Sequence, residues 1–276
     1  VVLSKLPGVF SDRGATPVEA GRFAYWSVAG IALLAALVMT GLKPGRPAQV
    51  RERPSVALSL RDGVRAARNP RIALSYLGAF AARADMAVIS LFLTLWVVQA
   101  ATAQGMAPDD AAARAGLVVG MALGASMLWS PVFGIIADRV NRLTLLCIGF
   151  LLAAIGYGWV ASLDDILATA SIPALLCLGI GQSSTVLTSS VLLAQEAPVG
   201  IRGAVFGLQN FCGAVGILAL SAGGGWLYDA VGPHAPVIAI AVANGAVAVS
   251  AIVVRRRELL AASALRADRA RPRPAY

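Results

Sequence analysis

The chain has 276 residues, of which 58% are hydrophobic and 13% are charged, and its formal net charge is +9. A soluble core cannot hold so many apolar side chains, whereas a lipid bilayer can, so the composition excludes an ordinary soluble domain. Because the positive charge is concentrated in particular connecting segments, it indicates orientation in a membrane, and no nucleic-acid partner is expected.

Seven long apolar stretches follow one another along the chain, and all but one are free of charge in their cores. Their predicted bounds are 23–42, 72–98, 115–137, 143–163, 166–193, 204–227 and 236–254. About 20 apolar residues in a helix cross the ~30 Å hydrocarbon layer. Backbone amides in lipid must pair within their own segment, which makes helices the natural form. The predicted fold class is therefore all-α, a polytopic membrane helical bundle.

Lysine and arginine are distributed unevenly between these stretches. Of the 23, 18 lie in the alternate segments 43–71, 139–142, 202 and 255–273, four lie in the other set, and one is intramembrane. The positive-inside bias places the rich set in the cytoplasm, where it contacts anionic lipid headgroups. We therefore expect a periplasmic loop over residues 1–22, a cytoplasmic tail over residues 255–276, and residence in the bacterial inner membrane.

No metal or cofactor site is expected. His234 is the only histidine, and Cys147, Cys177 and Cys212 lie inside apolar stretches, where cysteine acts as a small apolar residue. The stretches contain no paired carboxylates, histidine cluster or nucleophile–base spacing, so the chain is not expected to be an enzyme.

The longest connection, residues 43–71, begins irregularly and continues as a predicted amphipathic helix over residues 55–69. Apolar and basic residues there recur at helical spacing on two faces, namely Val56, Leu60 and Val64, and Arg61, Arg65 and Arg68. Such a helix is predicted to lie on the cytoplasmic membrane surface. A solvated helix with no membrane role is the alternative.

Arg83 and Asp85 are the charges inside the second stretch, about 17–20 Å from its inner end at 1.5 Å per residue. Charge at that depth faces a water-filled cavity or a partner. The two side chains differ by about 200° around the helix, so they do not face each other. We expect Arg83 to attract an anionic group of a substrate. We expect Asp85 to carry a proton, because desolvation disfavours a charged carboxyl; a structural charge network is the alternative.

Further polar side chains within the stretches are candidates for the same cavity. They are Tyr76, Gln182, Thr185, Ser189, Gln209 and Asn210. Hydrogen bonding between helices would also account for such residues.

The third stretch ends in Gly134-Ile-Ile-Ala-Asp138-Arg139-Val-Asn-Arg142. This segment resembles the loop signature G-x-x-A-D-R-x-G-R-[RK] of the major facilitator superfamily (MFS), with Asn141 and Leu143 departing from the pattern. Glu196-Ala-Pro-Val-Gly-Ile-Arg202-Gly203 resembles the P-x-x-x-R-G turn that often links the tenth and eleventh helices of that family.

The resemblance implies that the seven stretches are the sixth to twelfth helices of a twelve-helix transporter. Residues 23–42 would then be the last helix of an N-terminal half that is missing here, residues 43–71 the linker between halves, and residues 72–254 the six-helix C-terminal half. A true seven-span protein with an outside N-terminus is the alternative.

The signature also predicts a cytoplasmic latch. Gly134 permits close helix contact, and we expect ion pairs among Asp138, Arg139, Arg142, Glu196 and Arg202. Ion pairs made in only one conformation would bias a rocking transporter toward that state. Charges that only anchor the inner ends of the helices are the alternative.

The predicted function is secondary active transport of a small solute by alternating access, coupled to protons. The alternative is a seven-helix membrane sensor without retinal, since the only lysines, Lys5 and Lys43, lie outside the span cores and cannot form a Schiff base there. The isolated chain is expected not to transport.

Overall fold

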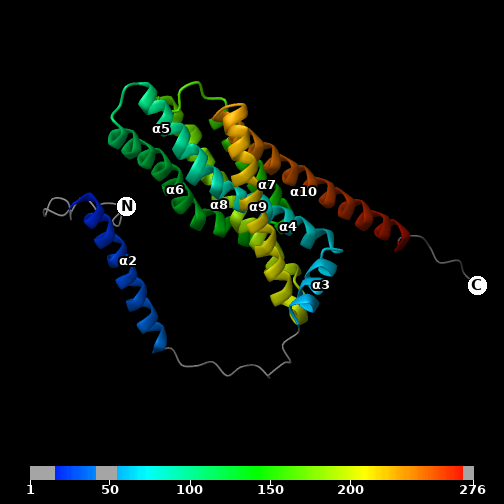
Figure 1. Ribbon diagram of the computed structural model, residues 1–276. Helices are drawn as coiled ribbons and strands as arrows, with labels where there is room; N and C mark the ends of the chain where they lie inside the picture. Colours follow the sequence, from blue (N-terminus) through cyan, green and yellow to red (C-terminus); the bar gives the residue numbers. More distant parts are fainter. Residues whose placement is uncertain (1–15, 42–54, 270–276) are drawn as a thin grey trace, which may run out of the picture. The chain divides into compact units, whose positions relative to one another are not determined.

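The computed structural model describes residues 16–41 and 55–269, which belong to two separate units, 1–53 and 54–276. Every regular element in these ranges is a helix, as Figure 1 shows. Among the described residues, six segments are long and apolar enough to cross a bilayer, which confirms the prediction of an all-α membrane bundle. Most of the predicted periplasmic loop, the first part of the linker and the end of the tail lie outside the described residues.

In the first unit, helix α2 (Pro17–Thr40) begins at a capping box. The Thr16 hydroxyl and N–H donate to the Glu19 carboxylate over 2.8 and 3.0 Å, which lowers the pKa of Glu19. The Glu19 N–H donates back to the hydroxyl over 3.4 Å. The apolar part of this helix, Tyr25–Thr40, is shorter than the six candidate spans. A membrane crossing by residues 23–42 therefore stays a prediction.

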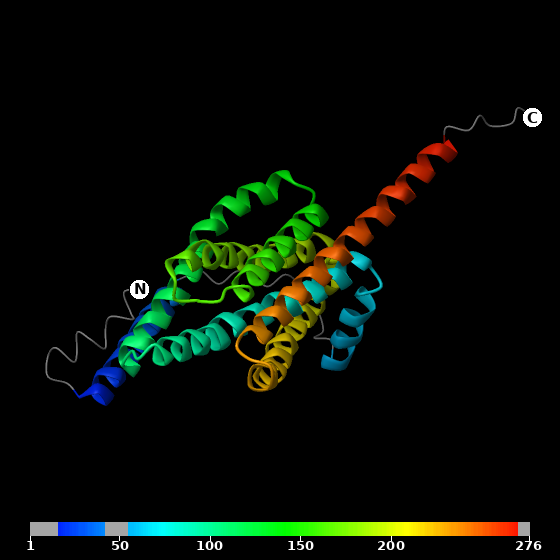
Figure 2. The same cartoon turned by 90° about the horizontal axis from the view of Figure 1, so that it is seen from above.

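The second unit holds the remaining helices that the structure describes. In chain order they are α3 (Val56–Ala66), α4 (Pro70–Ala87), the π-helical turn η2 (Val88–Leu93), α5 (Thr94–Ala103), α6 (Pro108–Arg139), α7 (Arg142–Ala161), η3 (Thr169–Ser171), α8 (Ile172–Glu196), η4 (Val199–Ile201), α9 (Arg202–Ala230) and α10 (His234–Arg269). Figure 2 shows the C-terminal part of α10 projecting beyond the other helices of this unit.

The six candidate spans overlap the six predicted stretches from 72–98 to 236–254. They are Pro70–Ala103, Pro108–Arg139, Arg142–Ala161, Thr169–Glu196, Val199–Ala230 and His234–Ala264. Several extend beyond the predicted bounds, because helices continue into polar flanking residues that hydropathy does not count.

Local chemistry sets where these helices start and turn. Asn69 and Asn141 cap α4 and α7, each accepting a hydrogen bond over 3.0 Å from an N–H two residues later. Proline occupies the first position of α4 and α6, where its missing N–H costs nothing. Gly105 and Gly232, at φ of 84° and 128°, form the turns before α6 and α10, which favour glycine because it lacks a Cβ.

The helices of the second unit pack closely through small residues. A side chain at Gly216 of α9 would collide with the Phe80 carbonyl of α4. A side chain at Gly181 of α8 would collide with the backbone of Ala153 on α7. Such contacts let backbones approach without a hydrophobic driving force between lipid-embedded helices. Helix α4 packs against α8, α9 and α10, and this position of α4 determines where its two charged side chains lie.

The span that begins with α4 changes from α-helical to π-helical geometry at Val88 and returns to α-helical geometry at Thr94. The π-helical turn begins three residues after Asp85. Turns of this kind are rare and often occur at functional sites. The sequence pattern did not predict it.

Candidate functional site

Arg83 and Asp85 lie on different sides of α4. Asp85 is fully buried, at 0% exposure, whereas Arg83 is exposed. This divergence agrees with the expected rotation of about 200° over two residues. The residues predicted to share one cavity are consequently divided between two environments.

The Asp85 carboxylate lies among helices α4, α8 and α10. Asn244 Nδ2 donates to Asp85 Oδ1 over 2.9 Å, and Thr185 Oγ1 donates to Asp85 Oδ2 over 3.1 Å. The Tyr157 hydroxyl of α7 donates to the backbone carbonyl of Asp85 over 3.4 Å. Among the described residues, no cationic group lies within 4.0 Å of this carboxylate. Asp85 is therefore held by neutral donors alone.

Thr185 and Asn244 could each form a different hydrogen bond if Asp85 changed its protonation state. Thr185 Oγ1 also lies 2.8 Å from the Gln182 carbonyl, and its single proton can serve only one acceptor at a time. Asn244 Oδ1 is buried and has no hydrogen-bond partner in the described part of the chain. A flip of this amide would offer an acceptor to a protonated Asp85. Small movements of these two side chains would therefore provide hydrogen-bond partners for Asp85 in either its ionised or its protonated form.

Arg83 borders a second, polar environment between α4, α8 and α9. This cavity of about 50 Å³ is lined by Ala79, Ala82, Arg83, Val186, Ser189, Ser190, Gln209 and Asn210. Arg83 Nη2 donates to Asn210 Oδ1 over 3.4 Å, a long contact. A Cβ at Gly213 would lie 2.6 Å from Arg83 Cγ, so glycine makes room for the arginine stem. In the described part of the chain, the other guanidinium donors have no hydrogen-bond partner.

The other predicted cavity residues have structural partners. Gln209 Nε2 donates to Ser75 Oγ and to the Ser189 carbonyl, each over 3.2 Å. Gln182 Oε1 accepts from Ser126 of α6 over 3.0 Å. The Tyr76 hydroxyl donates to the Gly63 carbonyl of α3 over 3.1 Å, which ties α3 to α4 instead of facing the cavity.

At the end of the bundle where α4 begins, Arg71 joins three helices. Its Nη1 lies 2.7 Å from Glu196 Oε1 of α8. Its Nε and Nη2 lie 2.7 and 2.8 Å from the two carboxylate oxygens of Glu258 on α10. Asn69 Nδ2 donates to the second Glu196 oxygen over 3.2 Å. Sequence reasoning missed this network, although Glu258 is one of only two acidic residues in the arginine-rich segment 255–276.

The predicted ion pairing of the latch needs correction. Within the described residues, Glu196 pairs with Arg71 and not with Arg139, Arg142 or Arg202. Arg202 instead donates to the Ala194 carbonyl over 3.2 Å. The physical reason is proximity, because the first turn of α4 brings Arg71 directly beside the end of α8.

The signature residues surround a polar pocket instead of forming ion pairs. A pocket of about 330 Å³ is lined by Arg71, Asp138, Arg139, Val140, Asn141, Arg142 and Gln195. Asp138 and Arg139 are exposed, and Arg142 Nη1 is buried without a hydrogen-bond partner in the described part of the chain. A Cβ at Gly134 would meet no described atom within 4 Å, so the expected close contact is not made here. A gating role for these residues stays a prediction.

The sequence profile of the Major Facilitator Superfamily matches residues 8–221. The chain therefore belongs to this superfamily of membrane transporters, and it is an integral membrane protein. This confirms the resemblance that residues 134–142 carry.

Relatives of this chain include the magnetosome protein MamH of Paramagnetospirillum magneticum, 30% identical over 189 residues, or 68% of this chain and 44% of MamH. The magnetosome protein MamZ of Magnetospirillum gryphiswaldense is 32% identical over 171 residues, or 62% of this chain and 26% of MamZ. The matched part thus spans less than half the length of these relatives. The crystal structure of a D-xylose-proton symporter is similar with a TM-score of 0.48 and 18% identity, covering 72% of this chain and 52% of that one.

Proposed function

We propose that this chain contributes the second half of a secondary transporter that moves a small anionic or zwitterionic solute together with protons. The observation that carries the proposal is the divergence of Arg83 and Asp85, two residues apart on α4, toward a small polar cavity and toward a fully buried set of neutral hydrogen-bond donors. One helix would then bind the solute on one side and a proton on the other. In this proposal the protein acts by transport and not by catalysis.

Arg83 is the proposed contact for the solute. A guanidinium offers five donors in a planar fork that matches a carboxylate or phosphate. In the described residues its only neutral partner is Asn210 at 3.4 Å, and no carboxylate lies within 4.0 Å. An unpaired charge within a span is costly, so a negatively charged group of the solute would stabilise it.

Asp85 is the proposed proton carrier. Its ionised form is stabilised by the Asn244 amide and the Thr185 hydroxyl, which draw α4 toward α10 and α8. Protonation would release Thr185 to the Gln182 carbonyl and weaken that attraction. The π-helical turn at Val88–Leu93 lies directly beyond Asp85, where a change in the packing of α4 could be absorbed. A ligand or proton shifts a conformational equilibrium only through such state-dependent contacts.

The arrangement in the membrane is part of the same proposal. We place the basic segments 43–71 and 255–276 in the cytoplasm of a bacterial inner membrane, with five helices of an N-terminal half preceding residue 1. On its own, the chain would form half of a translocation path plus one helix and would not transport.

Uptake of radiolabelled solutes into proteoliposomes tests this function. The transporter with all twelve helices should give saturable uptake of one class among carboxylates, phosphate esters, amino acids and neutral sugars, and we expect a class bearing a negative group. The 276-residue chain alone should give none. Saturable transport by the chain alone, or a preference for uncharged sugars that survives Arg83→Gln, would refute the proposal.

A further inference from the structure

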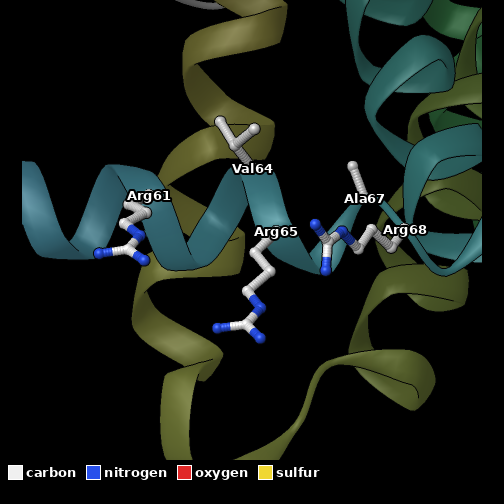
Figure 3. A pocket seen from close by; sticks show the side chains of 5 residues that line it. All are labelled: Arg61, Val64, Arg65, Ala67 and Arg68. Atoms are coloured by element: carbon white, nitrogen blue, oxygen red, sulfur yellow. The ribbon is translucent and has the colours of Figure 1, made fainter.

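Helix α3 and the turn that follows it carry three arginines that the transport proposal does not use. Arg61, Arg65 and Arg68 are exposed and border a pocket of about 620 Å³ together with Val64 and Ala67. Figure 3 shows Arg61 and Arg65 directed to one side of α3, Val64 and Ala67 to another, and Arg68 reaching back from the turn that follows the helix. Within the described part of the chain, none of the three has a carboxylate within 4.0 Å, in contrast to Arg71, which has two.

An apolar groove runs between the same helix and the start of α9. It has a volume of about 250 Å³ and is lined by Val56, Ser59, Leu60, Gly203, Ala204, Gly207, Leu208 and Phe211. Val56 is 87% exposed and Phe211 is 60% exposed, so large apolar surfaces border it. A Cβ at Gly207 would meet no described atom within 4 Å, which leaves open space along this part of α9.

Helix α3 contributes residues to both features and packs against α4 and α9. The Gly63 carbonyl accepts from Tyr76 of α4 over 3.1 Å. A Cβ at Gly63 would lie 3.0 Å from the Ala204 carbonyl and 3.1 Å from Leu208 Cβ, so α3 is seated closely on α9. The three arginines and the apolar groove are therefore both parts of one packed substructure.

The combination defines the chemistry of the occupant. Three arginines without carboxylate partners fit a phosphate, which guanidinium groups bind through charge-assisted hydrogen bonds. An apolar groove fits an acyl chain, because burying apolar surface is favourable. The groove also lies over the first turns of the span Val199–Ala230, where a chain enters the bilayer. A soluble polyanion would leave the groove empty, and a neutral lipid would leave the arginines unpaired.

We infer that α3 and the start of α9 form a binding site for one anionic phospholipid, with the phosphate at Arg61, Arg65 and Arg68 and one acyl chain in the groove. The bound lipid would fix α3 on α9. Gln209 and Asn210 of the polar cavity near Arg83 belong to the same turn of α9 as groove residues Leu208 and Phe211, so one helix carries residues of both. Lipid composition would thereby influence the conformation of α9.

The inference is tested with purified protein in a neutral detergent, to which palmitoyl-oleoyl phosphatidylglycerol, palmitoyl-oleoyl phosphatidylcholine or glycerol 3-phosphate is added. Native mass spectrometry counts bound molecules, and thermal unfolding reports stabilisation. Phosphatidylglycerol should bind and raise the unfolding temperature, and added salt should weaken the effect. The other two probes should have little effect.

Two variants separate the two parts of the site. Replacing Arg61, Arg65 and Arg68 together by Gln should weaken phosphatidylglycerol binding by roughly tenfold to a hundredfold, since a basic residue near an anionic surface contributes about fivefold. Gly207→Trp should weaken it by filling the groove. Replacing the exposed Arg255, Arg256 and Arg257 by Gln removes the same charge from α10 and should weaken binding much less, because these arginines do not line the apolar groove that would hold the acyl chain.

Three results would overturn the inference. If the variant lacking Arg61, Arg65 and Arg68 binds phosphatidylglycerol as well as the wild type, these arginines are not part of the site. An equal loss in the α10 triple variant would show a general charge effect. Equal stabilisation by glycerol 3-phosphate would show a site for a soluble phosphate and not for a lipid.

Discussion

Asp85 on α4 accepts a hydrogen bond from Asn244 on α10 over 2.9 Å, in a position with no exposed surface. The two residues are 159 positions apart in the chain, and both are fully buried. This hydrogen bond connects the proposed proton-binding residue on α4 to the neighbouring helix α10.

Replacing Asn244 by Leu removes one of the two donors to the carboxylate. We expect a loss of roughly 1–3 kcal/mol in unfolding free energy, because a buried acceptor is left unsatisfied. The loss should be larger at high pH than at low pH, since the missing donor stabilised the ionised form. Thermal unfolding at several pH values measures this. Ser250→Ala, which removes a hydroxyl bonded within the same helix, is the control and should change little.

Replacing Arg83 by Gln should abolish transport of an anionic solute, whereas Arg83→Lys should retain part of it because the charge remains. Stability should hardly change, because the guanidinium makes only the 3.4 Å contact with Asn210. Uptake assays and thermal unfolding on the same preparations distinguish the two effects. Arg256→Gln, an exposed position on α10, serves as the matched charge control. A large drop in unfolding temperature for Arg83→Gln would indicate a structural charge instead.

The Arg71–Glu258 pair should contribute to the docking of α10. Both side chains are partly exposed, so a double-mutant cycle with Arg71→Gln and Glu258→Gln should give a coupling energy of about 1 kcal/mol. The matching cycle with Glu196→Gln should give a similar value, because Arg71 holds both carboxylates. Additive effects in both cycles would mean that the network contributes nothing to stability.

Replacing Gly216 by Ala should impair assembly of the bundle, since even a Cβ collides with the Phe80 carbonyl. Overpacking of this kind costs about 1–3 kcal/mol. Size-exclusion chromatography after detergent extraction measures the fraction of monodisperse protein. Gly158→Ala is the control, because a Cβ there would meet no described atom within 4 Å. Equal yields for both variants would contradict the close packing of α4 and α9.

Features that depend on residues close together in the chain could be predicted from the sequence, whereas contacts between distant residues could not. Hydropathy is local, so the predicted stretch 143–163 lies close to the observed Arg142–Ala161. The divergence of Arg83 and Asp85 followed from the helical repeat alone. The partners of Asp85 did not, because Thr185 and Asn244 are 100 and 159 residues away and the sequence offers several polar residues on neighbouring helices.

The same limit explains the misassigned ion pair. Glu196 was assigned to the signature arginines because they lie at the same end of the bundle. Its observed partner, Arg71, was counted only as part of the basic linker. Which of many arginines at one membrane face reaches a given carboxylate depends on side-chain reach and helix position, and neither is encoded in a short motif.

The most direct test of the proton role of Asp85 uses the twelve-helix transporter in proteoliposomes loaded with a pH-sensitive dye, once its solute is known. Addition of solute should move protons together with it in the wild type. Asp85→Asn should still exchange the solute but move no protons. Proton movement by Asp85→Asn at the wild-type ratio to solute would contradict the assignment of Asp85 as the proton carrier.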